Sequence, residues 1–141
     1  MRRITLLLGL VVLALCAGSL AQTFPQVVAQ VSLTGQSHAI VTTPIYAPPV
    51  EGLFRVALDM VITTPTHDAR SWTPYIQWTD EAGRRERPAI PGLSVKAIPP
   101  QASLSWTYTF KAAASQPIEY GVMVSDPLSV YSLDVTVEQL Q

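Results

Sequence analysis

Hydrophobic and polar residues alternate along three long stretches of the chain. In SLSWTYTFK, residues 103–111, every even position is aliphatic or aromatic and every odd position is Ser, Thr or Lys. The stretches LFRVALDMVIT, residues 53–63, and VYSLDVTVEQL, residues 130–140, largely repeat this pattern. Successive side chains of a strand point to opposite faces of a sheet, whereas a helix would scatter these apolar residues around its surface. We therefore predict three half-buried strands. The inward residues predicted for the last two are Phe54, Val56, Leu58, Met60, Ile62, Tyr131, Leu133, Val135 and Val137.

Weaker alternation elsewhere predicts further strands and a total of about eight. Prolines and glycines separate the candidates, and no segment has the periodicity of an amphipathic helix. We predict an all-β fold, a single antiparallel β-sandwich of the jelly-roll or immunoglobulin-like type. Pro74 lies inside one candidate strand and cannot donate to a ladder, so that strand is expected at an edge or with a bulge. The weaker candidates are residues 27–34, 38–43, 72–79, 93–98 and 118–125.

The beginning of the chain has the composition of an export signal. Arg2 and Arg3 precede a long apolar run, and a small-x-small cleavage motif ends at Ala21. The apolar run is too short to span a bilayer comfortably. We predict a signal peptide at residues 1–21 and one sandwich domain at residues 22–141. The protein is then secreted or periplasmic, with no membrane span in its mature form.

Cys16 is the single cysteine of the sequence, and its position bears on membrane anchoring and on the chemistry open to the predicted domain. The stretch LALC partly resembles a lipobox, so a lipid anchor at Cys16 is the alternative to full secretion, although Leu15 is larger than the residue usual before a lipidated cysteine. The predicted domain has no cysteine, so packing alone must stabilise it, and cysteine zinc sites, thiol nucleophiles and redox motifs are excluded. Without Arg2 and Arg3 it has seven basic and ten acidic residues. This balance argues against a nucleic-acid partner.

Charge is concentrated in WTDEAGRRERP, residues 78–88. Gly83 can adopt the left-handed conformation that closes a short hairpin loop after the preceding strand. The charges are then the solvated tip of a hairpin, balanced in sign, where exposed pairs contribute less than about 1 kcal/mol each. The alternative is a loop that recognises a charged partner, such as a cell-surface polymer or a neighbouring subunit. Its candidate binding residues are Asp80, Glu81, Arg84, Arg85 and Arg87.

Three aromatic residues lie in SWTPYIQW, residues 71–78. Trp72 and Trp78 fall on the same face of a strand, about 20 Å apart, and Tyr75 falls on the opposite face. Exposed rings of this kind stack on sugars, so all three are candidate binding residues. Because Ile76 lies between the tryptophans and an indole hides a large area, we expect Trp72 and Trp78 in the core.

Other chemistry has little support. His67 and Asp68 are adjacent, but neighbours on an extended chain point apart, and a catalytic base needs an orienting partner. His38 is expected at a sheet surface or boundary. The chain has no G-x-S-x-G elbow, H-E-x-x-H pair or D-x-D-x-D-G loop. We predict no catalytic residue, no metal site and no cofactor, and we do not expect an enzyme.

One stretch of the chain is similar to known jelly rolls. TPIYAPPVEGLFRVALDMVIT, residues 43–63, resembles one part of complement-globular-head and tumour-necrosis-factor-like domains. In that part, a proline-containing segment is followed by a glycine, an aromatic residue and a long alternating strand. Gly52, Phe54 and Val56 occupy the matching places. The set GLFRV, WTDEAG and YSLDVTVEQL also resembles uncharacterised β-sandwich proteins of bacterial and phage genomes. The resemblance implies a jelly-roll-like sandwich used for structure or binding, with a trimer as one assembly. A phage virion component would be assembled in the cytoplasm, so the predicted signal peptide argues against that role.

Two classes of function remain open. The first is an extracytoplasmic, non-catalytic module for binding, adhesion or structure, whose loops at residues 65–70 and 80–91 contact a protein or a surface polymer. The second is a carbohydrate-binding accessory module or a small hydrolase that uses Trp72, Trp78 or His67. Homo-oligomerisation is a further hypothesis, based on outward apolar residues such as Val61 and Met123.

Overall fold

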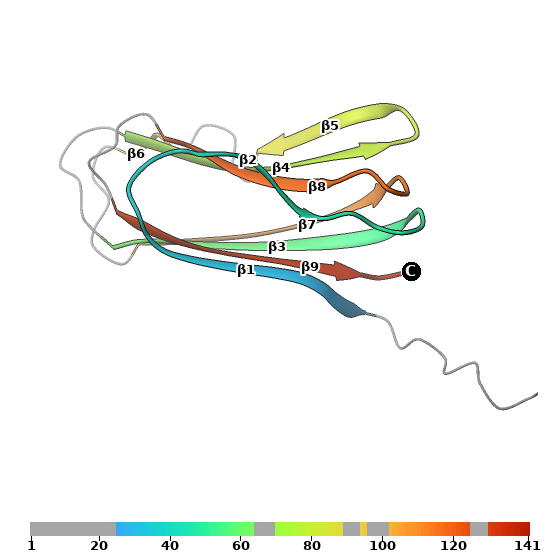
Figure 1. The fold of residues 1–141 in the computed structure, drawn as a ribbon. Helices are drawn as coiled ribbons and strands as arrows, with labels where there is room; N and C mark the ends of the chain where they lie inside the picture. Colours follow the sequence, from blue (N-terminus) through green and yellow to red (C-terminus); the bar gives the residue numbers. More distant parts are fainter. Residues whose placement is uncertain (1–24, 64–69, 89–93, 96–101, 125–129) are drawn as a thin grey trace, which may run out of the picture.

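The computed structural model describes residues 25–63, 70–88, 94–95, 102–124 and 130–141. These residues form nine β-strands, where about eight were predicted, and no helix (Figure 1). The strands are β1 Gln26–Gln36, β2 Ile40–Tyr46, β3 Gly52–Ile62, β4 Arg70–Asp80, β5 Gly83–Pro88, β6 Ser94–Val95, β7 Ser103–Ala112, β8 Ile118–Val124 and β9 Tyr131–Gln139.

The strands build two antiparallel sheets that lie as separate layers (Figure 1). Sheet 1 has the order β1-β9-β3-β7, and sheet 2 has the order β2-β8-β4-β5, with β6 paired to β4. From β1 to β4 and from β7 to β9 the chain changes sheet at every connection, and the first strand pairs with the last. The first two strands of an immunoglobulin sandwich share a sheet, whereas β1 and β2 do not. The chain therefore has a jelly-roll fold.

The core lies between the two sheets and includes every inward residue predicted for the 53–63 and 130–140 stretches. Strand β3 lies between β9 and β7, so its inward face is covered on both sides as well as from above. Phe54, Val56 and Leu58 have no exposed area at all. Sheet 2 contributes Trp72, Ile76, Trp78, Ile118, Tyr120 and Val122.

Strand β7 shows the same alternation as β3 but is less deeply buried. Its outward residues are exposed, as predicted, and Phe110 and Ala112 are buried. Leu104, Trp106 and Tyr108 are only partly buried. The reason is that β7 is the last strand of sheet 1, so its inward side chains have a strand neighbour on one side only.

Strand β5 is absent from the sequence prediction, which placed residues 83–88 in a loop. The segment pairs with β4 over six residues, from Asp80 opposite Gly83 to Tyr75 opposite Pro88. It has no hydrophobic alternation because it is the outermost strand of sheet 2 and carries polar residues on both faces. The loop prediction for residues 83–88 is therefore wrong. Of the strand predicted at residues 93–98, the described residues contain only β6.

Pro74 occupies a short unpaired side of β4. Strand β8 pairs with β4 along one side and lies opposite Pro74 at Val122. On the other side of β4, the pairing with β5 ends at Tyr75, and the pairing with β6 covers only Arg70 and Ser71. Within the described residues, Pro74 thus lies where no second strand needs its missing N–H. The prediction of an edge strand or a bulge is wrong, because β4 is an inner strand of sheet 2 and its register with β8 and β5 has no shift; Pro74 is tolerated at this locally unpaired position.

Candidate binding face

The β4–β5 hairpin is closed by a two-residue turn, as the glycine suggested. Asp80 lies opposite Gly83, and Glu81 and Ala82 form the turn. Gly83 has a φ of 109°, which side chains other than glycine rarely adopt. The Ala82 N–H donates to Asp80 Oδ1 at 2.8 Å and supports the turn from inside.

The alternation of β5 separates the charged residues onto two faces. Arg85 lies opposite Trp78, and Arg87 lies opposite Ile76, so both arginines are on the core side of the sheet, at its rim. Arg85 Nε lies 3.0 Å from Asp80 Oδ2, and the Arg87 guanidinium lies 5.3 Å from the centre of the Tyr108 ring. Of these two contacts, the one between Arg87 and Tyr108 joins β5 to β7 at the open edge of the sandwich.

The Asp80–Arg85 pair also changes the acidity of the carboxyl group. The hydrogen bond from Arg85 is the largest cause that lowers the pKa of Asp80 below its usual value of 3.8, and the Ala82 N–H adds to it. The carboxylate form is therefore favoured in the folded state. Its contribution to stability is present above pH 3.8 and is lost as the pH falls through the lowered pKa.

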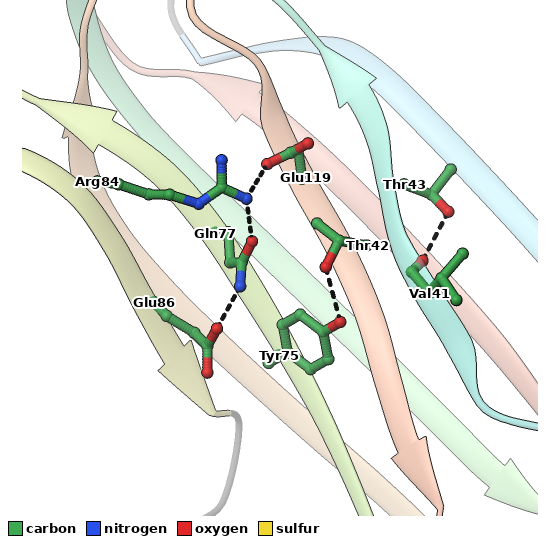
Figure 2. Close-up of polar contacts among 8 residues, drawn as sticks. All are labelled: Val41, Thr42, Thr43, Tyr75, Gln77, Arg84, Glu86 and Glu119. Atoms are coloured by element: carbon green, nitrogen blue, oxygen red, sulfur yellow. Dashed lines mark hydrogen bonds and ion pairs between the residues drawn. The ribbon is translucent and has the colours of Figure 1, made fainter.

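Four polar side chains form a bonded network on the outer face of sheet 2 (Figure 2). Arg84 Nη2 lies 2.7 Å from Glu119 Oε2, and the same nitrogen donates to Gln77 Oε1. The Gln77 amide nitrogen in turn donates to the Glu86 carboxylate. The network joins β5, β4 and β8, so the exposed Arg84 has side-chain partners on two other strands of the sheet.

Tyr75 lies on the same outer face but is itself covered. Its side chain is 7% exposed, and its hydroxyl shares a 2.9 Å hydrogen bond with Thr42 Oγ1 of β2 (Figure 2). The ring crosses β8 at Gly121, where a β-carbon would lie 2.3 Å from the ring. Tyr75 therefore ties three strands together and offers little surface to a ligand.

Two exposed aliphatic side chains complete this face. Val41 of β2 is 80% exposed and Met123 of β8 is 52% exposed. They follow the paired residues Ile40 and Val122, whose side chains pack in the core, so both point away from the core on neighbouring strands. We call the outer surface formed by Val41, Met123, Gln77, Arg84, Glu86 and Glu119 the sheet-2 face.

The two tryptophans predicted as possible sugar platforms are part of the core. Trp72 is 3% exposed and Trp78 is 6% exposed. Trp78 packs against Phe110 with ring centres 4.6 Å apart, and so joins the two sheets. Trp72 Nε1 is buried without a hydrogen-bond partner in the described part of the chain. Neither indole presents a face for stacking, so the core interpretation is confirmed.

The remaining candidates lie apart from one another. Asp80 and Glu81, with Glu51 and Lys111, line a cavity of about 210 Å³ beside the hairpin turn. This is smaller than a typical small-molecule pocket of about 300–1,000 Å³. His38 is exposed, and its Nδ1 lies 2.9 Å from Ser37 Oγ. Of the loop predicted at residues 65–70, Arg70 is instead the first residue of β4, and the rest, with His67 and Asp68, lies outside the described residues.

Two general features bear on function. Within the described ranges, no three His, Cys, Asp or Glu side chains are grouped so that they could hold a metal ion. The same part of the chain contains no helix of the length and apolar character that a membrane crossing needs.

The apolar residues that suggested an oligomer differ in exposure. Val61 lies between Ser103 and Ser132 in sheet 1 and is only partly exposed, whereas Met123 is on the sheet-2 face. Val41 has the largest exposed fraction among the large hydrophobic residues described, and sequence reasoning missed it. It points outward because it directly follows Ile40, whose side chain packs against the core.

Comparison with known proteins finds likeness in fold alone. No family model and no curated protein sequence matches the chain. The infectious bursal disease virus VP2 subviral particle is similar with a TM-score of 0.45 and 11% identity; the likeness covers 83% of this chain and 33% of that one, so this chain spans about a third of its length. Eiger TNF from S. frugiperda is similar with a TM-score of 0.37 and 13% identity, over 83% of this chain and 88% of that one.

Proposed function

We propose that this protein is an extracytoplasmic, non-catalytic binding module whose contact surface is the sheet-2 face. The observation that carries the proposal is that one outer face holds both a bonded arginine network and two exposed apolar side chains. Arg84 is held by Glu119 and Gln77 before any partner arrives, so less conformational entropy is lost on binding.

The chemistry of this face favours a macromolecular partner. Arginine and methionine are enriched at protein interfaces, and the face offers both beside an exposed valine. Side chains on the outside of a sheet form a broad surface, which fits a protein or a surface polymer better than a small molecule. Charges of both signs, from Arg84, Glu86 and Glu119, would set the orientation of the partner.

The export part of the proposal is based on the leader-like residues 1–21. Mass spectrometry of the protein recovered outside the cytoplasm should find Gln22 at its N-terminus. A diacylglyceryl mass on Cys16 would instead indicate the lipid-anchored form. Retention of Met1 in a cytoplasmic protein would contradict export in either form.

The binding part is tested with variants of the sheet-2 face. Met123→Glu and Arg84→Ser each change an exposed side chain, so both variants should fold. Each should weaken binding on a glycan array and on isolated cell-surface polymers or proteins by at least about tenfold. The matched control is Gln30→Glu, which changes an exposed residue on the outer face of sheet 1 and should bind as the unaltered protein does.

Two results would contradict this function. Binding that is equally strong in Met123→Glu, Arg84→Ser and the control would remove the sheet-2 face from the proposal. Turnover in a general esterase and glycosidase screen, abolished by His67→Ala, would show the hydrolase alternative to be right.

A further inference from the structure

We propose that two copies of this chain associate through the free edge of β7, with the two β7 strands paired antiparallel across a twofold axis. Sheet 1 would then continue from one copy into the other. This surface is separate from the sheet-2 face, and the proposal does not depend on the binding function.

In the described part of the chain the two strand orders end in four edge strands, besides the two-residue β6, and three of the four carry features that discourage pairing with another chain. In β5, Arg85 and Arg87 lie on the core side, where an added strand would desolvate them. In β2, the register shifts on both sides of the Thr43–Pro44 stretch, and Pro44 lacks a donor. In β1, the register with β9 shifts at two places.

Strand β7 has none of these features. Its ten residues pair with β3 from Gly52 opposite Ala112 to Val61 opposite Ser103 without a shift. The strand contains no proline, and its only charged residue is Lys111 near one end. A long, regular edge strand of this kind is a template for strand addition.

The hydrogen-bond pattern shows which backbone groups of β7 point to the free edge. The Ile62 N–H donates to the Ala102 carbonyl at 2.9 Å, so this directly opposed pair is a hydrogen-bonded one. Bonded and non-bonded pairs alternate along an antiparallel ladder, so the even residues of β7 bond to β3. The N–H and C=O groups of the odd residues point away from β3, where no strand of the described chain pairs with β7. These residues are Ser103, Ser105, Thr107, Thr109 and Lys111.

The strand is also complementary to itself. With Thr107 on the twofold axis, Ser105 faces Thr109 of the second copy on the outer side of the sheet. On the inner side, Trp106 faces Tyr108 of the second copy, and both side chains are only partly buried in one copy. Aromatic pairs and Ser/Thr pairs are favourable across strands. Lys111 falls opposite Ser103, so no like charges of the two β7 strands meet directly, while Arg87 of β5 lies over the Tyr108 ring on the inner side.

One substitution should prevent pairing at the free edge of β7 without disturbing the pairing of β7 with β3. Thr107→Pro removes an N–H that points to the free edge, takes no bond from β3, and places its ring on the exposed outer side. Thr107→Val keeps the N–H and is the matched control. Sedimentation should show a reversible dimer for the unaltered protein and for Thr107→Val. In Thr107→Pro the dimer Kd should rise about a hundredfold or more, because two ladder bonds are lost per dimer.

Amide hydrogen exchange of the unaltered protein is a second test that needs no variant. Raising the concentration from dilute to dimer-forming should slow exchange at Thr107 and Thr109 by about tenfold or more, whereas Trp106 and Tyr108 are protected at both concentrations. A monomer at every concentration, a trimer, or a dimer that Thr107→Pro leaves intact while Thr107 exchanges freely would each overturn the proposal.

Discussion

Among the described glycines, Gly121 has the least room for a side chain. A β-carbon at this position would lie 2.3 Å from both the Cζ and the hydroxyl oxygen of Tyr75. Alanine is ordinarily tolerated in a strand better than glycine, so a loss of stability on replacing Gly121 by alanine would point to a local clash. The Tyr75 ring would have to move, and its hydrogen bond with Thr42 would break.

We expect Gly121→Ala to lower the free energy of unfolding by about 1–3 kcal/mol, measured by urea denaturation. The same substitution made in a Tyr75→Ala background should cost much less, since the space beside residue 121 is then empty. An equal cost in both backgrounds would show that the Tyr75 ring is not the cause.

Tyr131 makes stability depend on alkaline pH. Its side chain has no exposed area, its hydroxyl donates to the His38 carbonyl at 2.7 Å, and burial raises its pKa from 10.0 to about 12. The unfolded chain loses this proton near pH 10, whereas the folded chain keeps it, so stability is fully present below pH 10 and falls between pH 10 and about 12.

The test measures the urea midpoints of the unaltered protein and of Tyr131→Phe at pH values from 9 to 12, a range that includes both the usual and the raised pKa of Tyr131. The phenylalanine variant should be less stable at pH 9, by about 1 kcal/mol for the lost hydrogen bond. Its stability should decline less steeply above pH 10. Parallel curves would mean that the Tyr131 hydroxyl does not titrate differently in the folded state.

At the scale of the element, the arginines of β5 protect an edge. Arg85 and Arg87 occupy core-side positions of the outermost strand of sheet 2, and Arg87 covers the Tyr108 ring. Charged side chains placed there oppose the addition of a further strand. We therefore expect their main effect to be on solubility.

We expect Arg85→Thr combined with Arg87→Thr to leave the circular dichroism spectrum unchanged and to increase aggregation, measured by light scattering during incubation at moderate temperature. The charge-matched control is Arg84→Thr with Lys111→Thr, which removes two positive charges from outward positions. Equal aggregation of the two double variants would attribute the effect to net charge alone.

At the scale of the whole molecule, the two sheets stabilise each other through one apolar layer. Leu58 of sheet 1 has no exposed area, and Trp78 of sheet 2 packs against Phe110 of sheet 1. We expect Leu58→Ala to cost about 2–5 kcal/mol. Near-ultraviolet and far-ultraviolet circular dichroism should still melt at one shared midpoint, because neither sheet has a core of its own. Separate midpoints would contradict a single cooperative unit.

The sequence alone determined the secondary structure class and the orientation of most side chains. The period of two in residues 53–63 and 130–140 identified the inward residues of β3 and β9, and Gly83 indicated a hairpin closed after Asp80. Alternation is a local property, since each residue of a strand points opposite to its neighbour whatever the strand pairs with. Burial of Trp72 and Trp78 was predicted on the same basis.

Only the tertiary structure decided which strands are central and which residues meet. Leu104 follows the same pattern as Leu58, yet it stays partly exposed because β7 ends a sheet and β3 does not. The contact of Arg84 with Glu119 joins residues 35 positions apart, and it exists because β5, β4 and β8 are neighbours. Strand order depends on the packing of distant segments, and no local pattern encodes it. For that reason the candidate binding face and the free edge of β7 become visible only in the folded chain.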